Sequence, residues 1–283
     1  MRRPGKRYLR LAGHVSLATI LFVVLFLNLA PLVWGLLASI RPREAIMAYP
    51  PRVFTESVSL EHYRTIFEGG FLQPLQSSTL YALVTAVAAL LLGSLAAYAI
   101  DRLRFRGRSL VLLAIVSGIP LASGAAALIV PNYIYLTSLG LTNSAVTLPL
   151  IYVAYNLPLV TWILKGAISG ISPELDEAAA VDGANRFQIL FGVILPLCKP
   201  AIGAAAIFAF VGAWNEFVAG SVLVESAVLR PIQVAIYQNI GFFGRDWGPL
   251  LASAAVATLP IIVIFILFGR LLVSGLTAGS VKG

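Results

Sequence analysis

The sequence predicts an all-α membrane protein with six transmembrane helices. Hydrophobic residues make up 59% of the 283-residue chain and charged residues only 11%, whereas a soluble domain carries about 25% charged residues. The mean hydropathy is +0.91. The charged residues stand in short clusters between long uncharged runs, an arrangement that is typical of membrane spans joined by loops. We therefore expect most of the chain to lie in lipid.

Six apolar segments are long enough to cross the hydrocarbon core, which needs about 20 residues of helix. They are residues 15–40, 75–100, 110–136, 144–165, 201–224 and 249–273. The third and fourth come from one uncharged run, 109–164, which is too long for a single helix and which divides at the turn-forming residues 138–143. We expect helices because each satisfies its own backbone hydrogen bonds in lipid, and because the alternation typical of a β-barrel is absent.

The basic residues predict the orientation. Six spans place both termini on one side, and that side receives 14 of the 20 Lys and Arg residues. The short segment 101–108 alone carries four arginines. Because cytoplasmic loops are enriched in Lys and Arg, we expect both termini to be cytoplasmic. The chain is thus predicted to be a multi-pass membrane protein.

The predicted organisation follows from these spans. It comprises a cytoplasmic basic N-terminus (1–14), a first transmembrane helix (15–40), an extracytoplasmic loop (41–74), a transmembrane domain of five helices (75–273) and a cytoplasmic tail (274–283). The first apolar run is too long for the core of a signal peptide, so we expect it to be retained. The outside loops 41–74 and 225–248 are long enough to touch a partner, although a simple connector fits them equally well.

No pattern typical of an enzyme is present. The net charge of +8 reflects membrane orientation, so we expect no nucleic-acid partner. The sequence lacks the phosphate-binding Gly-x-x-x-x-Gly-Lys-Ser/Thr segment, and His14 and His62 are isolated. Cys198 is the only cysteine and is expected to be a small apolar filler. We therefore predict that the chain is not an enzyme, has no catalytic residues, and binds neither a metal nor a cofactor.

The segment 165–200, between the fourth and fifth spans, is unusually long and patterned for a connector. Ser172 and Pro173 predict the start of a short helix with acidic residues in its first turns. Gly183 suits the left-handed turn that would end this helix, and Asn185 can cap a second one. Pro196 and Pro200 are expected to break the second helix before the fifth span.

We expect this helix-turn-helix to present an acidic, alanine-rich surface that docks in a groove of a soluble partner. The alternative is an amphipathic helix that rests on the lipid surface. Four acids disfavour that alternative, because anionic lipid repels them. They are Glu174, Asp176, Glu177 and Asp182.

This segment resembles the signature loop of bacterial ABC importer permeases: Glu-Ala-Ala, three residues, Gly, nine residues, Ile, any residue, Leu-Pro. The matching residues are Glu177, Ala178, Ala179, Gly183, Leu195 and Pro196, and Val193 replaces the Ile. The resemblance implies a type I ABC importer permease fold, with residues 75–273 as its transmembrane domain and 165–200 as its coupling loop. It also implies contact with an ATPase subunit through Glu177, Ala178, Ala179, Asp182, Gly183 and Pro196.

Further segments resemble the carbohydrate-uptake permeases. Residues 213–217 look like the Trp-Asn-Glu-Phe segment of their fifth span, and residues 275–283 look like the C-terminus of the smaller maltose-type permease. His62-Tyr63 before the second span also resembles this group. Polar and aromatic candidates for a substrate path are Trp214, Asn215, Glu216, Asn156 and Tyr152. A structural or gating role for Glu216, and helix–helix contacts for the others, are left open.

The resulting hypothesis is a permease subunit of an ATP-driven importer for a sugar or sugar-like solute. The resemblance implies that it is a multi-pass protein of the cytoplasmic (inner) membrane of a prokaryote. The implied partners are a homologous second permease, two ATP-binding cassette subunits that carry ATP and Mg, an extracytoplasmic solute-binding protein, and membrane lipid. The nearest alternative is an ABC permease for glycerol phosphate or another polar solute. An ion-coupled secondary transporter predicts midplane ionisable groups and repeats, of which only Glu216 is present. A non-transport membrane module would need a polar catalytic cluster, and the sequence shows none.

Overall fold

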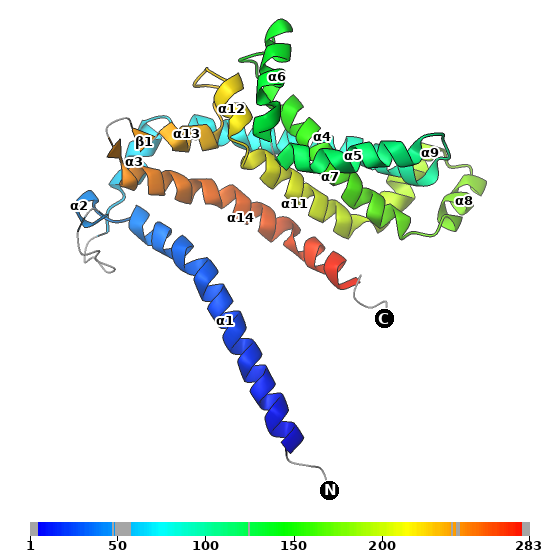
Figure 1. Cartoon of the computed structure of the whole chain (residues 1–283), viewed down its shortest axis with the longest axis horizontal. Helices are drawn as coiled ribbons and strands as arrows, with labels where there is room; N and C mark the ends of the chain where they lie inside the picture. The colour runs from blue at the N-terminus through cyan, green and yellow to red at the C-terminus, as the bar shows by residue number, and fades with distance from the viewer. Residues whose placement is uncertain are drawn as a thin grey trace. The chain divides into compact units, whose positions relative to one another are not determined.

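The structure, a computed structural model, describes residues 5–46, 48, 58–123, 125–238, 240–241 and 244–278 (Figure 1). It divides into two compact units, of which unit 1 contains residues 1–69 and 239–256 and unit 2 contains residues 70–238 and 257–283. Within the described residues the secondary structure is helical, apart from an antiparallel pairing of β1 (Ile240–Gly241) with β2 (Gly244–Arg245). The all-α prediction is therefore confirmed.

Unit 1 is built from α1 (Gly5–Ser39), α2 (Arg43–Ile46), α3 (Glu61–Glu68) and the first part of α14 (Trp247–Ala278). Because α1 begins before residue 15, the helix includes part of the basic N-terminus. Most of its described apolar side chains are exposed, as with Phe22 at 68% and Leu27 at 65%. An apolar surface of this extent needs lipid or another membrane protein around it.

A buried histidine, His62, connects α3 to the residue Arg41 after α1 and to α14, all within unit 1. The imidazole Nε2 of His62 lies 2.9 Å from the carbonyl oxygen of Arg41, and the ring contacts Gly248 at the start of α14. Ser39 Oγ lies 2.7 Å from the hydroxyl oxygen of Tyr63. His62 thus has a structural role in joining these elements. Residues 47 and 49–57 of the segment lie outside the described residues.

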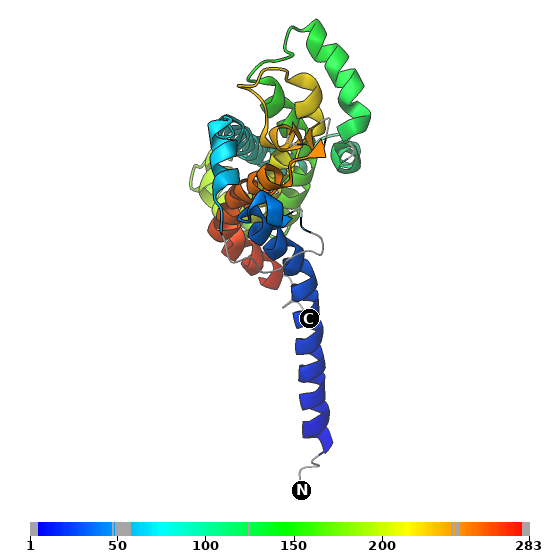
Figure 2. The same ribbon diagram turned by 90° about the vertical axis from the view of Figure 1, so that its left-hand side faces the viewer.

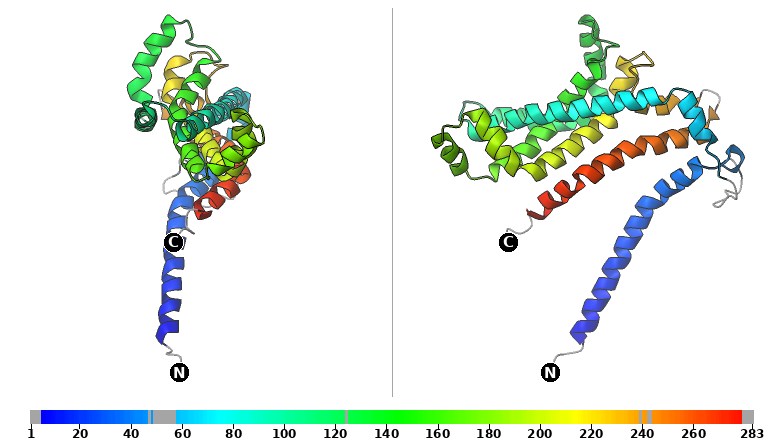
Figure 3. Two further views of the ribbon diagram at one scale, coloured as in Figure 1. Left: turned by 90° about the vertical axis from the view of Figure 1, so that its right-hand side faces the viewer. Right: turned by 180° about the vertical axis from the view of Figure 1, so that it is seen from behind.

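Unit 2 is centred on α4 (Leu72–Arg102), α7 (Thr147–Ser169) and α11 (Lys199–Trp214), which pack side by side (Figure 3). Small residues in these helices are completely buried, namely Ala82, Ala89 and Ala97 of α4 and Ala205 and Ala209 of α11. Small side chains let transmembrane helices approach closely, and dispersion contacts then stabilise the pair. This packing explains why the three helices form the core of unit 2.

Gly93 lies at a close contact between α4 and α7. A Cβ at this position would be 2.8 Å from Cγ1 of Val160, which is completely buried. We predict that Gly93→Leu lowers the free energy of unfolding by about 1–3 kcal/mol, because the extra atoms overpack the contact. Thermal unfolding in detergent measures this. Gly166→Leu on α7 is the matched control, because a Cβ at Gly166 meets open space; equal loss in both variants would contradict the prediction.

The third predicted span, 110–136, is described as two helical segments. Its residues belong to α5 (Arg108–Ser123) and α6 (Ala125–Ser138), and residue 124 between them lies outside the described residues, so a single continuous helix stays a prediction. Figure 2 shows α6 set apart from the packed helices of unit 2. Pro120 lies inside α5 and Pro131 lies inside α6, and each removes one backbone donor from its helix.

The fifth predicted span, 201–224, is also interrupted. α11 ends at Trp214, and α12 (Val218–Leu223) follows after three non-helical residues. At its other end, α11 is bent by 88° from the helical segment 186–197. Among the described residues, four helices are long and apolar enough to cross a membrane, or five if this bent pair counts as one span. A count of six crossings therefore stays a prediction.

The remaining boundaries agree more closely with the sequence. The turn predicted at 138–143 separates α6 from α7, with left-handed backbone at Gly140 (φ +66°) and Asn143 (φ +54°). Asn143 Oδ1 accepts hydrogen bonds from the backbone of Glu225 and Ser226. α13 (Ile232–Gln238) lies within the second predicted outside segment, 225–248. α14 extends to Ala278, beyond the predicted residue 273, and residues 279–283 lie outside the described part of the chain.

Candidate functional site

The coupling loop, residues 165–200, folds as the predicted helix-turn-helix. α8 (Glu174–Val181) begins after Pro173, and Ser172 Oγ lies 3.4 Å from the backbone nitrogen of Glu174. Gly183 has φ +86°, a left-handed conformation that favours glycine. The predicted turn at Gly183 is therefore confirmed.

Asn185 caps α9 (Arg186–Ile189), as the sequence predicted. Its Oδ1 accepts from the backbone nitrogen of Gln188 at 3.0 Å, and Oε1 of Gln188 accepts from the backbone nitrogen of Asn185 at 2.8 Å. This reciprocal capping box satisfies two otherwise unpaired backbone donors. The turn between α8 and α9 is thus fixed from both sides, by a glycine conformation and by a side-chain cap.

The path from α9 to α11 differs from the prediction. The chain continues as a π-helix (Leu190–Ile194) and as α10 (Leu195–Leu197), so Pro196 does not break the helix. The break falls at Cys198, where the 88° bend lies. A π turn shifts the hydrogen bonds by one residue, and Pro196 has no N–H that would need a partner. Pro200 lies in the first turn of α11, where proline is tolerated.

The residues predicted to contact an ATPase subunit lie mostly at the surface. Glu177, Ala178, Asp182, Gly183 and Pro196 are exposed, and Ala179 is half-buried. Large apolar side chains are exposed beside them: Val181 at 88% and Phe187 at 66%. Exposed apolar groups among charged ones are typical of a protein-binding surface. The prediction from the sequence included only the acids and alanines of this surface, and it did not include these apolar side chains.

One acid of α8 points the other way. Asp176 is the only buried residue of α8. Its Oδ1 accepts from the Tyr98 hydroxyl at 3.1 Å, and its Oδ2 accepts from Arg102 Nε at 2.9 Å. The prediction of one exposed acidic surface is therefore wrong for Asp176, because two buried donors at the end of α4 hold its carboxylate.

Arg102 is the centre of a group that we call the Arg102 cluster: Tyr98, Asp101, Arg102, Ser169 and Asp176. Besides Asp176, Arg102 donates to Asp101 Oδ2 at 2.6 Å and to the backbone carbonyls of Ile168 and Ile171 at 3.3 and 2.8 Å. Ser169 Oγ donates to Asp101 Oδ1 at 2.6 Å, and Lys165 Nζ lies 3.6 Å from the same oxygen. The side chains of Asp101, Arg102 and Asp176 are 7–10% exposed.

No local pattern in the sequence predicts this cluster. The arginines of the segment 101–108, Arg102 among them, predict only the orientation in the membrane, and Asp176 is predicted as part of the acidic surface. The partners Arg102 and Asp176 are 74 residues apart, and only the packing of α4 beside α7 brings them together. Buried charges are tolerated when they are paired and hydrogen-bonded, and that condition is met here.

Cys198 lies at the bend close to this cluster and is 3% exposed. Burial raises the pKa of the Cys198 thiol, and the positive charge of Arg102 acts in the opposite direction. A buried thiol in its protonated form is a poor nucleophile. The expectation of an inert apolar filler agrees with this position.

The candidates for a substrate path divide into buried and accessible groups. Trp214 is 1% exposed and stacks on Phe210, with ring centroids 5.7 Å apart, and Asn215 is exposed at the end of α11. The carboxylate of Glu216 accepts from the backbone nitrogens of Ala219 at 2.9 Å and Gly220 at 3.3 Å. Glu216 therefore has a structural role, because it satisfies the first donors of α12.

The two candidates on α7 lie in helix contacts. Tyr152 is 1% exposed, and its hydroxyl has no hydrogen-bond partner among the described residues. Asn156 Nδ2 donates to the carbonyl of Tyr152 at 2.8 Å, and its side chain packs against Gly212 of α11. Contact with substrate stays a prediction for all five candidates.

With this geometry in hand, comparison with known proteins shows the family. The model of the family described as "Binding-protein-dependent transport system inner membrane component" matches residues 89–277. The chain belongs to this family. The matched range of the permease includes the Arg102 cluster and the whole coupling loop.

The permease also matches individual relatives over almost its full length. It is 31% identical to the inner membrane ABC transporter permease protein YcjP of Escherichia coli over 277 residues, with 97% of each chain covered. It is 32% identical to the trehalose/maltose transport system permease protein MalG of Thermococcus litoralis over 284 residues, with 98% of each covered. The diacetylchitobiose uptake system permease protein DasC of Streptomyces coelicolor is 34% identical over 267 residues, covering 92% of this chain and 95% of the relative. The resemblance drawn from the coupling loop is confirmed.

A solved structure has the same fold. It is a chain of a bacterial ABC transporter that imports the acidic polysaccharide alginate, with a TM-score of 0.76, 20% identity, and coverage of 95% of the permease and 98% of that chain. At this identity the likeness concerns the fold alone. The permease is therefore a multi-pass inner-membrane component with the fold of an ABC importer subunit.

Proposed function

We propose that this permease is one of two membrane subunits of an ATP-driven importer for a sugar or sugar-like solute. The coupling loop would dock on an ATP-hydrolysing subunit at the cytoplasmic face, and ATP and Mg would bind to that subunit rather than to this chain. The observation that carries the proposal is the exposed turn from Glu177 to Gly183, in register with the Glu-Ala-Ala signature and fixed by Gly183 and Asn185.

The relatives support the class of solute. Three of them are permeases for trehalose/maltose, diacetylchitobiose and galactooligosaccharides. The alternative, glycerol phosphate or another polar solute, has less support, because these relatives are permeases for sugars. A structural neighbour, with a TM-score of 0.65, is described in complex with a pentasaccharide-bound periplasmic protein. We therefore propose a solute-binding protein as the partner outside the membrane.

The proposed mechanism uses the rigidity of the loop. Two ATPase subunits close on nucleotide and move their clefts, and α8 follows the cleft that holds it. The attached spans tilt, and the solute path opens to the opposite side of the membrane. Such coupling requires that the docked loop has different affinity for the two states of the ATPase.

Uptake into proteoliposomes tests the proposed function. The permease, a second permease, the ATPase subunits and the binding protein are reconstituted together, and uptake of labelled maltose, chitobiose and glycerol 3-phosphate is measured. We expect uptake of a sugar that requires both ATP and the binding protein. Uptake of glycerol phosphate, without uptake of either sugar, would show that glycerol phosphate is the solute instead of a sugar. Uptake driven by a proton or sodium gradient without the ATPase subunits would overturn the proposal.

A further inference from the structure

We propose that Arg102 is the positioning residue that transmits movement of the docked α8 to the membrane spans. This inference rests on the proposed function, because it assigns the connection between the coupling surface and the transmembrane core. Arg102 touches no ATPase surface in this role. It acts through Asp176 and through the carbonyls at the end of α7.

The attachment of α8 to unit 2 is narrow. Seven of the eight residues of α8 are not buried, and the remaining one is Asp176. The Asp176 carboxylate connects α8 to the end of α4 through its hydrogen bonds with Tyr98 and Arg102, and α8 also packs against α9 and the π-helix. A separate apolar attachment follows α9, where Ile189, Leu190 and Ile194 are 0–2% exposed. A force on α8 thus reaches the spans at two places, and the Asp176 contact is the one on α8.

Arg102 joins three elements through one rigid group. It belongs to α4, its Nε bonds α8 through Asp176, and its Nη2 bonds the carbonyls of Ile168 and Ile171 at and after the end of α7. The guanidinium is planar and its donors have fixed directions, so it cannot follow one partner without displacing the others. A lysine ammonium has no such fork. The side chain is 9% exposed, so water does not weaken these bonds as it would at the surface.

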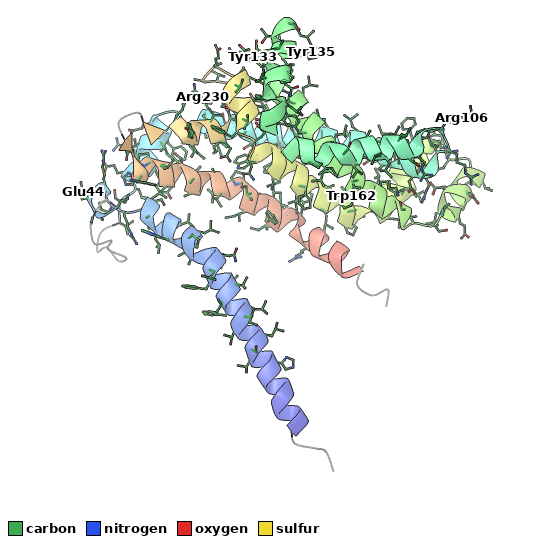
Figure 4. All side chains as sticks on the ribbon, viewed as in Figure 1. Glu44, Arg106, Tyr133, Tyr135, Trp162 and Arg230 are labelled. Atoms are coloured by element: carbon green, nitrogen blue, oxygen red, sulfur yellow. The ribbon has the colours of Figure 1, made fainter. Side chains whose placement is uncertain are left out.

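The position fits transmission rather than orientation of the chain in the membrane. Arg106 is another arginine of the segment after α4, and Figure 4 shows it at the end of unit 2 that carries α8 and α9 in Figure 1. Arg106 is exposed, whereas Arg102 makes four hydrogen bonds in a nearly buried site. Arg106 therefore provides a matched control with the same charge and neighbourhood.

The test measures solute uptake and ATP hydrolysis in the same reconstituted complex. Arg102→Gln combined with Asp176→Asn replaces the buried ion pair by two neutral amides and leaves neither charge of that pair unpartnered. We expect this double variant to assemble and to hydrolyse ATP, whereas the solute taken up per ATP falls by roughly tenfold or more, as for the loss of an allosteric coupling. Tyr98→Phe removes one bond to Asp176 and should lower the same ratio by a smaller factor. Arg102→Lys alone should give a ratio of uptake to ATP between those of the double variant and the wild type. Arg106→Gln should keep the wild-type ratio.

A wild-type ratio of uptake to ATP in the double variant overturns the role of Arg102. Failure of the double variant to assemble, together with a wild-type ratio in Tyr98→Phe, shows a purely structural role and also overturns it. Failure of the wild-type complex to couple uptake to ATP instead contradicts the proposed function.

Discussion

Gly183→Pro is expected to abolish ATP-coupled uptake while the permease remains in the membrane. Gly183 has φ +86°, whereas the proline ring fixes φ near −65°. Its backbone N–H also donates to the carbonyl of Ala180 at 3.1 Å, and proline has no donor. A cost of about 3 kcal/mol reduces the population of the native turn by roughly a hundredfold. Uptake and ATP hydrolysis in proteoliposomes measure the effect.

Further substitutions separate the effect of the backbone conformation at Gly183 from the mere loss of a glycine. Gly183→Ala should weaken uptake less than proline does, because the left-handed conformation costs an alanine about 1–2 kcal/mol. Gly183→Asn should come closest to the wild type, since asparagine tolerates this conformation. Gly192→Ala, in the same loop, should be neutral because Gly192 is exposed and a Cβ there meets open space. Equal activity of the proline and asparagine variants would contradict the proposed role of this turn.

Glu177→Lys should prevent the ATPase subunits from remaining bound to the permease. Glu177 is exposed on α8, beside Ala178, and is not part of the buried core of unit 2. In the docked complex its carboxylate would be desolvated against the partner, where loss of one member of a charge pair costs about 2–5 kcal/mol. Reversal of the charge adds repulsion. The amount of ATPase subunit that co-purifies with the permease measures the effect.

Two variants control for charge. Glu177→Gln keeps the shape and should give an intermediate loss of bound ATPase. Glu61→Lys reverses an exposed acid on α3, in the segment predicted to be extracytoplasmic, and should leave the co-purified amount unchanged. Equal binding in Glu177→Lys and the wild type would contradict the assignment of Glu177 to the docking surface.

The parts that the sequence predicted best are those determined by local chemistry. Gly183 and Asn185 are each sufficient to identify a turn and a cap, because the required backbone angle or donor lies within a few residues. The long apolar helices α4 and α7 were equally predictable from hydropathy. The end of α11 was less predictable, because it falls within the fifth apolar run, where Glu216 starts to cap α12.

The Arg102 cluster could not be predicted, because its members meet only through tertiary packing. Asp176 stands in a run of acids, and no local pattern distinguishes it from the exposed Glu177. The substrate-path candidates show the same limit. Tyr152 and Trp214 are polar or aromatic residues in apolar runs, and such residues serve helix contacts as readily as ligands. Burial, which depends on the whole fold, is what separates these alternatives.

Photo-crosslinking from α8 tests the central claim most directly. A benzophenone amino acid replaces Ala178, which is exposed beside Glu177, in the fully assembled transporter in membranes. We predict a covalent product with an ATPase subunit, and no such product when the same group replaces Leu60, which is 65% exposed in the segment predicted to face the outside. Crosslinks from position 178 to lipid or to the solute-binding protein, with none to the ATPase, would contradict the proposed docking of the coupling loop.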